Sequence, residues 1–148
     1  MTASSRPHDT DDPQRTAALA SLDRLVGRWE VSGPDNLRGT TRFEWMQGRR
    51  GFLVQHVQLT QADGDAVGVE YIGWHPERRE LTSHYFGADG GLLEYTWRVT
   101  AETLTIFFGT AESPARYLGT FTDDGNTNAG GWEWPGGGYL STMTRLPD

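Results

Sequence analysis

The sequence has no cysteine and no lysine, and all thirteen of its basic residues are arginine. A chain without cysteine forms no disulfide, thiol nucleophile, Cys-ligated zinc site or iron–sulfur cluster. A chain without lysine offers no side-chain amine for a Schiff base with a carbonyl substrate or pyridoxal phosphate, and no P-loop lysine. These absences exclude the chemistry of thiols and of lysine amines.

Positive charge and long apolar runs are also scarce. The 148 residues carry a formal net charge of −7, and the only adjacent basic pairs are Arg49-Arg50 and Arg78-Arg79. Nucleic-acid affinity comes from clustered positive charge, so we expect no nucleic-acid partner. The chain contains no run of about eighteen apolar residues, and it does not open on a stretch like a signal peptide. We therefore expect a cytoplasmic protein that does not bind membranes.

The beginning of the chain separates into a polar arm and one helix. Residues 1–12 are polar, and we expect them to form a flexible arm. Asp12 is a suitable N-cap, and Pro13 suits the first turn of a helix. We expect this helix to cover residues 13–26 and to end at Gly27. Its apolar residues recur at helical spacing and are Leu19, Leu22, Leu25 and Val26.

The rest of the chain alternates apolar and polar residues between Gly-rich turns, as strands of an antiparallel meander do. The predicted strands are 28–32, 40–46, 52–60, 67–74, 81–86, 93–99, 104–108, 116–121, 131–134 and 139–145. Short, regular spacing without a second helix favours an up-and-down barrel or a sandwich over a βαβ fold. We predict an all-β closed antiparallel barrel of about ten strands preceded by one helix, forming a single domain over residues 13–148. A barrel of this size should leave room inside.

Residues 22–29 read Leu-Asp-Arg-Leu-Val-Gly-Arg-Trp, a helix end followed by Gly-x-Trp at the start of the first strand. This pattern resembles the calycins, the superfamily of lipocalin, fatty-acid-binding and nitrobindin-like barrels. The resemblance implies that a basic residue near the last strand packs over the Trp. Arg145 is placed to make this cation–π contact with Trp29 and so to close the barrel.

A wider resemblance covers residues 19–146. The segments 68–73, 83–87, 113–116 and 134–139 are similar to a family of uncharacterised bacterial lipocalin-like proteins, which has no agreed activity. Nitrobindins bind haem through a His near the C-terminus, but this chain has no His after His84. Haem binding by that route is therefore not expected, which leaves His56 or His84 as the alternative haem ligand.

The first functional hypothesis is a binding module. The chain has six Trp, five Tyr and six Phe, and aromatic rings make good walls for organic ligands. A small, mostly apolar molecule would occupy the lumen without a cofactor. Gln55 or His84 would supply polar anchors. The predicted walls are Trp45, Tyr85, Tyr95, Trp97, Tyr117 and Trp132.

The second hypothesis is a cofactor-independent acid–base enzyme, such as an isomerase, dehydratase or cyclase. Its proton would be moved by Glu70, His56 or His84. Glu70 is ambiguous because Ile72 and Trp74 share its face of the strand, and a carboxyl turned into an apolar lumen would have a raised pKa. A register error of one residue would exchange His56 for Gln55 on the inner face.

A third hypothesis is a barrel whose lumen is filled by its own side chains. Such a protein would act through its outer surface, with a homodimer as one arrangement. His8 in the arm and His75 beside a turn proline are expected to be solvated. No metal site is expected, since the spacing of the four His residues defines none.

Overall fold

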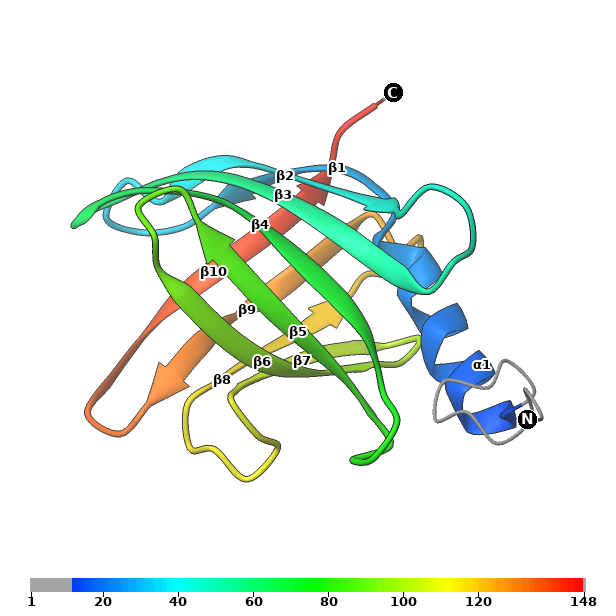
Figure 1. Cartoon of the computed structure of the whole chain (residues 1–148). Coiled ribbons are helices and arrows are strands. Elements are labelled where there is room, and N and C mark those ends of the chain that lie inside the picture. Colours follow the sequence, from blue (N-terminus) through cyan, green and yellow to red (C-terminus); the bar gives the residue numbers. More distant parts are fainter. Residues whose placement is uncertain (1–11, 148) are drawn as a thin grey trace.

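The computed structural model describes residues 12–147, so His8 and all but the last residue of the predicted arm lie outside the described residues. Within these residues the fold is mostly β, with ten antiparallel strands and helical residues only before them (Figure 1). The strands are β1 (Gly27–Ser32), β2 (Arg38–Trp45), β3 (Phe52–Gln61), β4 (Gly64–His75), β5 (Glu80–Gly87), β6 (Leu92–Val99), β7 (Thr103–Phe108), β8 (Arg116–Phe121), β9 (Thr127–Trp134) and β10 (Gly137–Arg145).

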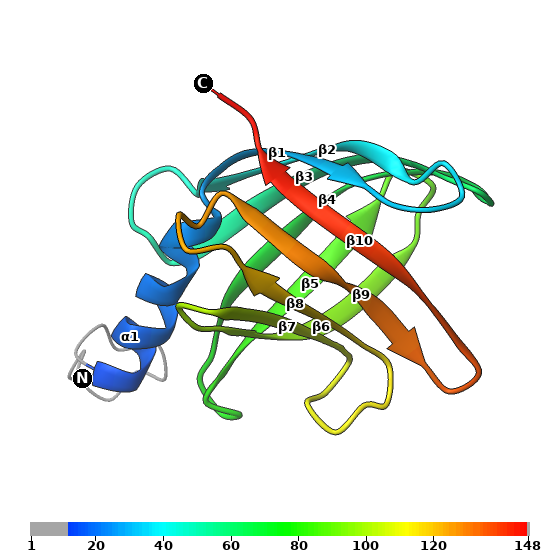
Figure 2. The ribbon, with the colours of Figure 1, turned by 180° about the vertical axis from the view of Figure 1, so that it is seen from behind.

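The ten strands form a closed barrel in which each strand pairs with its neighbours in sequence and β1 pairs with β10. Figure 2 shows β10 beside β9 as the barrel returns to β1. The predicted barrel is confirmed, and the sandwich alternative is wrong because the ladder closes on itself. β9 begins at Thr127, earlier than predicted, since its pairing with β8 and β10 continues through Asn128 and Gly130.

One helical segment precedes the barrel. Asp12 caps α1 (Pro13–Ser21) by accepting hydrogen bonds from the backbone N–H groups of Gln14 and Arg15 at 3.0 and 3.4 Å. The chain then tightens into the 3₁₀ helix η2 (Leu22–Leu25), so the predicted helix is shorter and less regular than expected. In a 3₁₀ helix, residues i and i+3 share a face. Leu22 and Leu25 are therefore both directed into the barrel, and both are fully buried.

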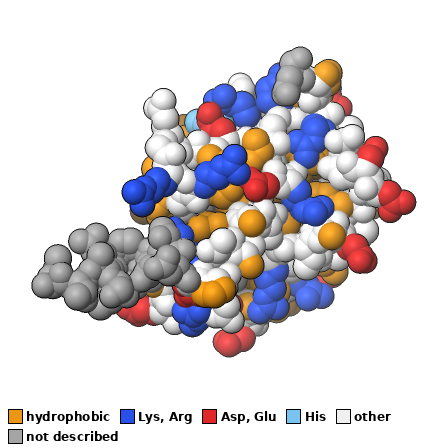
Figure 3. Space-filling view, turned by 90° about the vertical axis from the view of Figure 1, so that its right-hand side faces the viewer, with side chains coloured by type: hydrophobic (Ala, Val, Ile, Leu, Met, Phe, Trp, Pro, Cys, Tyr) orange, Lys and Arg blue, Asp and Glu red, His pale blue; other side chains and the backbone are white. Residues whose placement is uncertain are grey.

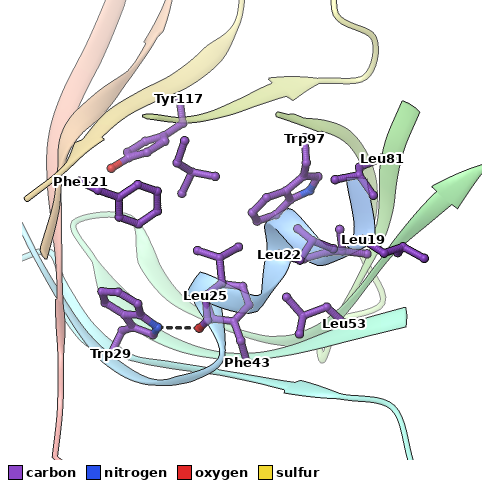
Figure 4. Packing of buried hydrophobic residues seen from close by; sticks show 12 residues of the cluster. Leu19, Leu22, Leu25, Trp29, Phe43, Leu53, Leu81, Trp97, Tyr117 and Phe121 are labelled. Atoms are coloured by element: carbon purple, nitrogen blue, oxygen red, sulfur yellow. Dashed lines mark hydrogen bonds between the residues drawn. The ribbon is translucent and has the colours of Figure 1, made fainter. Parts of the chain in front are cut away.

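These leucines form the centre of an apolar core at the helix-bearing end of the barrel (Figure 4). They pack against inward-facing side chains from strands all around the ring. The other buried members of this cluster are Leu19, Trp29, Phe43, Leu53, Ile72, Leu81, Trp97, Leu104, Tyr117 and Phe121. The helical segment thus closes one end of the barrel with apolar side chains. It does not fill the opposite end.

The surface at this end is mixed in character. Figure 3 views the molecule from the side that carries α1 and shows basic, acidic and apolar side chains interspersed. In the described part of the chain, neither α1 nor η2 has the length and apolar character needed to cross a bilayer.

Arg145 joins the last strand to the first at the same end. Its guanidinium carbon lies 4.2 Å from the centroid of the Trp29 ring, so the contact expected between these two side chains is present. The guanidinium also donates to the carbonyl oxygens of Arg24 at 2.7 Å and Val26 at 2.5 Å, and to Asn126 Oδ1 at 3.0 Å. One side chain therefore ties β10 to η2, to β1 and to the β8–β9 turn.

Gly27 leaves room for this guanidinium. A Cβ atom at this position would lie 2.6 Å from Arg145 Nη1, and the residue has a φ of +128°. Any other residue would be strained here and would displace Arg145. The sequence predicts that Gly27 ends the helix, but Gly27 is the first residue of β1. Its lack of a side chain leaves space for the Arg145 guanidinium.

We expect Arg145→Ala to lower the free energy of unfolding by about 2–4 kcal/mol, because it removes a ring contact and charge-assisted hydrogen bonds. Urea unfolding followed by Trp fluorescence measures this change. Arg28→Ala is the matched control, since Arg28 is an exposed β1 residue whose guanidinium donates, among the described residues, to the Pro147 carbonyl oxygen. Equal unfolding midpoints for the two variants would show that the Arg145 contacts do not hold the barrel closed.

Candidate functional site

A cavity of about 670 Å³ occupies the barrel beyond the apolar core. All ten strands contribute to its wall. Side chains next to the turns at the end opposite α1, such as Gln61, Trp134 and Tyr139, belong to the lining, and the cavity is therefore reached from that end. Its volume lies within the range of small-molecule sites in proteins.

The cavity wall is strongly aromatic. Nine lining residues carry aromatic rings, which give the site large flat contact surfaces. Several of these rings also pack against one another: Tyr95 lies edge-on to Trp132 with 5.9 Å between ring centroids, and Trp132 lies 5.8 Å from Tyr117. The nine are Phe43, Tyr85, Tyr95, Trp97, Phe108, Tyr117, Trp132, Trp134 and Tyr139.

One face of this wall carries a chain of five hydrogen-bonded side chains. Thr41 Oγ1 donates to Gln55 Oε1 at 2.7 Å, and Gln55 Nε2 donates to Glu70 Oε1 at 2.9 Å. From the other side, Trp97 Nε1 donates to Ser83 Oγ at 2.9 Å, and Ser83 Oγ donates to Glu70 Oε2 at 2.5 Å. The chain is centred on the Glu70 carboxyl, which receives one hydrogen bond on each oxygen.

The strand register brings these five residues together. They come from five consecutive strands, β2 to β6, and all face inward. Glu70 lies directly opposite Gln55 in the β3–β4 ladder and directly opposite Tyr85 in the β4–β5 ladder. Side chains of directly opposed residues in neighbouring antiparallel strands lie within contact distance. The inward-facing position of Glu70 therefore places its carboxyl between polar partners on both sides.

Burial dominates the ionisation of Glu70. Only 5% of the residue is exposed. This burial raises the pKa of Glu70 from its ordinary value of 4.5 to about 7, while the hydrogen bond from Ser83, which is itself bonded to Trp97, acts in the opposite direction. Burial penalises the charged form, and donors to the carboxylate favour it. The carboxyl therefore changes protonation state near neutral pH.

Tyrosine hydroxyls are the other polar groups of the cavity. Burial raises the pKa of Tyr117 to about 12 and raises the pKa of Tyr95, Tyr85 and Tyr139, so all four stay protonated at neutral pH. The negative charge of Glu70 raises the pKa of Tyr85 and Tyr95 further. These hydroxyls are thus neutral hydrogen-bond donors and acceptors.

Gly68 positions one of these tyrosines. A Cβ atom on Gly68 would lie 2.5 Å from the Tyr85 hydroxyl oxygen, so the phenol lies directly over the glycine backbone. Tyr85 is therefore held flat along the wall beside Glu70, and a larger residue at position 68 would push it into the cavity.

The predicted ligand-binding residues divide into two groups. Six of them line the cavity, as does the candidate acid–base residue Glu70. Two others do not line it: Trp45 and His84. The six that line it are Gln55, Tyr85, Tyr95, Trp97, Tyr117 and Trp132.

Trp45 lies at the helix-bearing end, where its Nε1 donates to Asp23 Oδ1 at 2.9 Å. It points inward but lies at the level of the apolar core, below the cavity. His84 lies on the outer face of β5 and pairs with Glu94 at 3.0 Å. The structure therefore does not bring either side chain to the other predicted ligand contacts.

His56 also lies on the outer face. Its Nε2 is 2.8 Å from Glu44 Oε2, across the β2–β3 ladder. Gln55, the neighbouring residue, takes the inward position. Among the described residues that line the cavity, none is His, so neither His56 nor His84 could ligate a haem iron inside the barrel. His75 lies at the β4–β5 turn, where its Nδ1 accepts from the Arg78 backbone N–H at 3.1 Å.

Four polar residues of this region were not predicted as site residues. Ser83 and Thr41 complete the hydrogen-bonded chain, and Tyr139 supplies a further hydroxyl. Asn128 is fully buried and accepts from the Tyr117 hydroxyl at 2.6 Å. The available signal was position: each lies two residues, or a multiple of two, from an inward-facing aromatic or apolar residue on its strand.

No protein-family model matches the chain, and no curated protein matches it.

We expect stability to fall as Glu70 ionises. Well below pH 4.5 the carboxyl is protonated in both the folded and unfolded states. As the pH rises, the unfolded state releases this proton first, so folding becomes less favourable until the folded pKa of about 7 is passed. Relative to Glu70→Gln, which stays neutral, the native protein should lose about 3 kcal/mol of unfolding free energy between about pH 4.5 and pH 8.

Urea unfolding at several pH values measures this difference. Glu30→Gln is the matched control, because Glu30 is an exposed carboxylate on β1. A difference between the native protein and Glu70→Gln that does not change with pH would show that Glu70 does not titrate in this range.

Proposed function

We propose that this protein binds a small, mostly apolar organic molecule inside the barrel. The observation that carries this proposal is the 670 Å³ cavity with nine aromatic lining residues and one buried carboxyl held by hydrogen bonds. Sites of this kind are mainly apolar and contain a few fixed polar groups that orient the ligand. The cavity argues against a lumen filled by the protein's own side chains.

The fold supports a calycin-like assignment. A closed ten-strand antiparallel barrel, a helical segment at one end and the Trp29–Arg145 contact are compatible with that superfamily. We propose that the chain is a calycin-like binding barrel. Barrels of one architecture serve many functions, so the function depends on the cavity.

A second candidate function is acid–base catalysis on a bound substrate. Glu70 favours it, because a buried carboxyl with a pKa near 7 can accept or donate a proton at neutral pH. Of the three residues predicted for this role, Glu70 is the one inside the cavity. An isomerase, dehydratase or cyclase of this type would use Glu70 as base and a tyrosine hydroxyl to stabilise a developing oxyanion.

We expect N-phenylnaphthylamine, a neutral apolar dye, to bind in the cavity with a rise in its fluorescence. Ser141→Trp should weaken this signal, because Ser141 lines the cavity and an indole there would occupy part of it. Leu140→Trp is the matched control, since the neighbouring Leu140 is 69% exposed. Fluorescence titration measures both. Equal dye binding by the two variants would place the dye outside the barrel.

The catalytic candidate is tested with nitrobenzisoxazole, a flat neutral compound. A base removes its ring C–H proton, the N–O bond breaks, and a coloured cyanophenolate forms. We expect turnover to increase as Glu70 ionises from about pH 6 to pH 8, and to fall about a hundredfold or more in Glu70→Gln. Absorbance assays follow the product. Equal rates for the native protein and Glu70→Gln would remove Glu70 from the reaction.

A further inference from the structure

Glu70 has no cationic partner inside the cavity. Among the described residues that line it, none is Arg or His, and Glu70 is the one acidic residue. The chain contains no lysine. When Glu70 is ionised, the cavity therefore carries one negative charge in apolar surroundings, where charges interact more strongly than in water.

The directions of the hydrogen bonds show that the site is arranged around a carboxylate. An indole N–H can only donate, so Trp97 requires the Ser83 oxygen to accept. The Ser83 proton is then directed to Glu70 Oε2. On the other side, Thr41 donates to Gln55 Oε1, which leaves the Gln55 amide N–H group directed to Glu70 Oε1. In this arrangement Ser83 and Gln55 each donate a hydrogen bond to the Glu70 carboxyl.

Each carboxylate oxygen retains capacity for a second hydrogen bond, because an ionised carboxylate has about four lone-pair sites and two are used. Glu70 belongs to the cavity lining, so a ligand can reach it. That ligand must donate a hydrogen bond. A second carboxylate at this position would place two negative charges side by side in a buried site, which is unfavourable.

Aromatic rings surround the same carboxyl. Tyr85 lies opposite Glu70 in the ladder, and Tyr95 and Trp97 lie on the next strand, β6. The faces of such rings attract cations. The uncompensated carboxylate and the aromatic wall therefore both favour a positively charged ligand.

We propose that the ligand is an apolar amine in its protonated form, whose ammonium group donates to Glu70 and whose apolar body contacts the aromatic wall. This inference rests on the proposed function, and it selects an organic cation over the anionic and neutral alternatives. Glu70 is then a specificity-determining residue.

The test compares three compounds that share one ring system: naphthylmethylamine, naphthylmethanol and naphthoate, all substituted at the same ring carbon. Isothermal titration calorimetry near pH 8 should show the amine binding about tenfold or more tighter than the alcohol, and the carboxylate binding most weakly. In Glu70→Gln, amine affinity should fall about tenfold or more, while alcohol affinity should change little. Ser83→Ala, which removes one donor to Glu70, provides a second variant.

The pH dependence gives an independent readout. The other titratable groups that line the cavity with Glu70 are Tyr85 on β5, Tyr95 on β6, Tyr117 on β8 and Tyr139 on β10, and burial keeps all four protonated. Amine affinity should therefore follow the ionisation of Glu70 and decrease about tenfold per pH unit below pH 7. Alcohol affinity should not follow this profile.

Equal affinities for the amine and the alcohol, or tighter binding of naphthoate, would overturn the amine inference and leave the binding proposal standing. Amine affinity that is unchanged in Glu70→Gln would also overturn it. If N-phenylnaphthylamine and all three naphthyl compounds fail to bind, the proposed function fails as well.

Discussion

The contact between Arg145 and Trp29 is the interaction on which the rest of the structure depends. It lies where the last strand meets the first, and its hydrogen bonds extend to the helical segment that closes this end. A closed ladder leaves no unpaired strand edge. Without closure, the inward-facing side chains of β1 and β10 would no longer face those of the opposite wall, and there would be no enclosed interior.

The two ends of this interior have different roles. Leu22 and Leu25 fill the helix-bearing end, so stability is concentrated there, and the cavity occupies the other end. Glu70 lies in the wall of that cavity. Its burial is unfavourable for the charged carboxyl, and hydrogen bonds on both oxygens offset only part of that cost. Because the burial of Glu70 weakens folding, a functional role would account for a carboxyl at this position.

Much of the fold could be predicted from the sequence, because strand alternation and Gly-rich turns are local signals. The site was less accessible. Along β4 both faces are apolar, with Val69 and Tyr71 outside and Ile72 inside, so alternation alone did not assign a direction to Glu70. His84 has the same difficulty, because the outward-facing Phe86 shares its face of β5. Trp45 points inward as predicted. Strand alternation shows which face a residue is on, but not whether it lies beside the helix or in the cavity.

The relay from Trp97 through Ser83 to Glu70 has an optical consequence. The indole N–H of Trp97 is hydrogen-bonded to the hydroxyl that is itself bonded to the carboxyl. Any event that adds charge to Glu70 or removes it changes the polarisation of that hydroxyl and hence the electrostatic field on the indole. Trp97 is therefore an internal reporter of the state of Glu70, and its emission should change without any movement of the backbone.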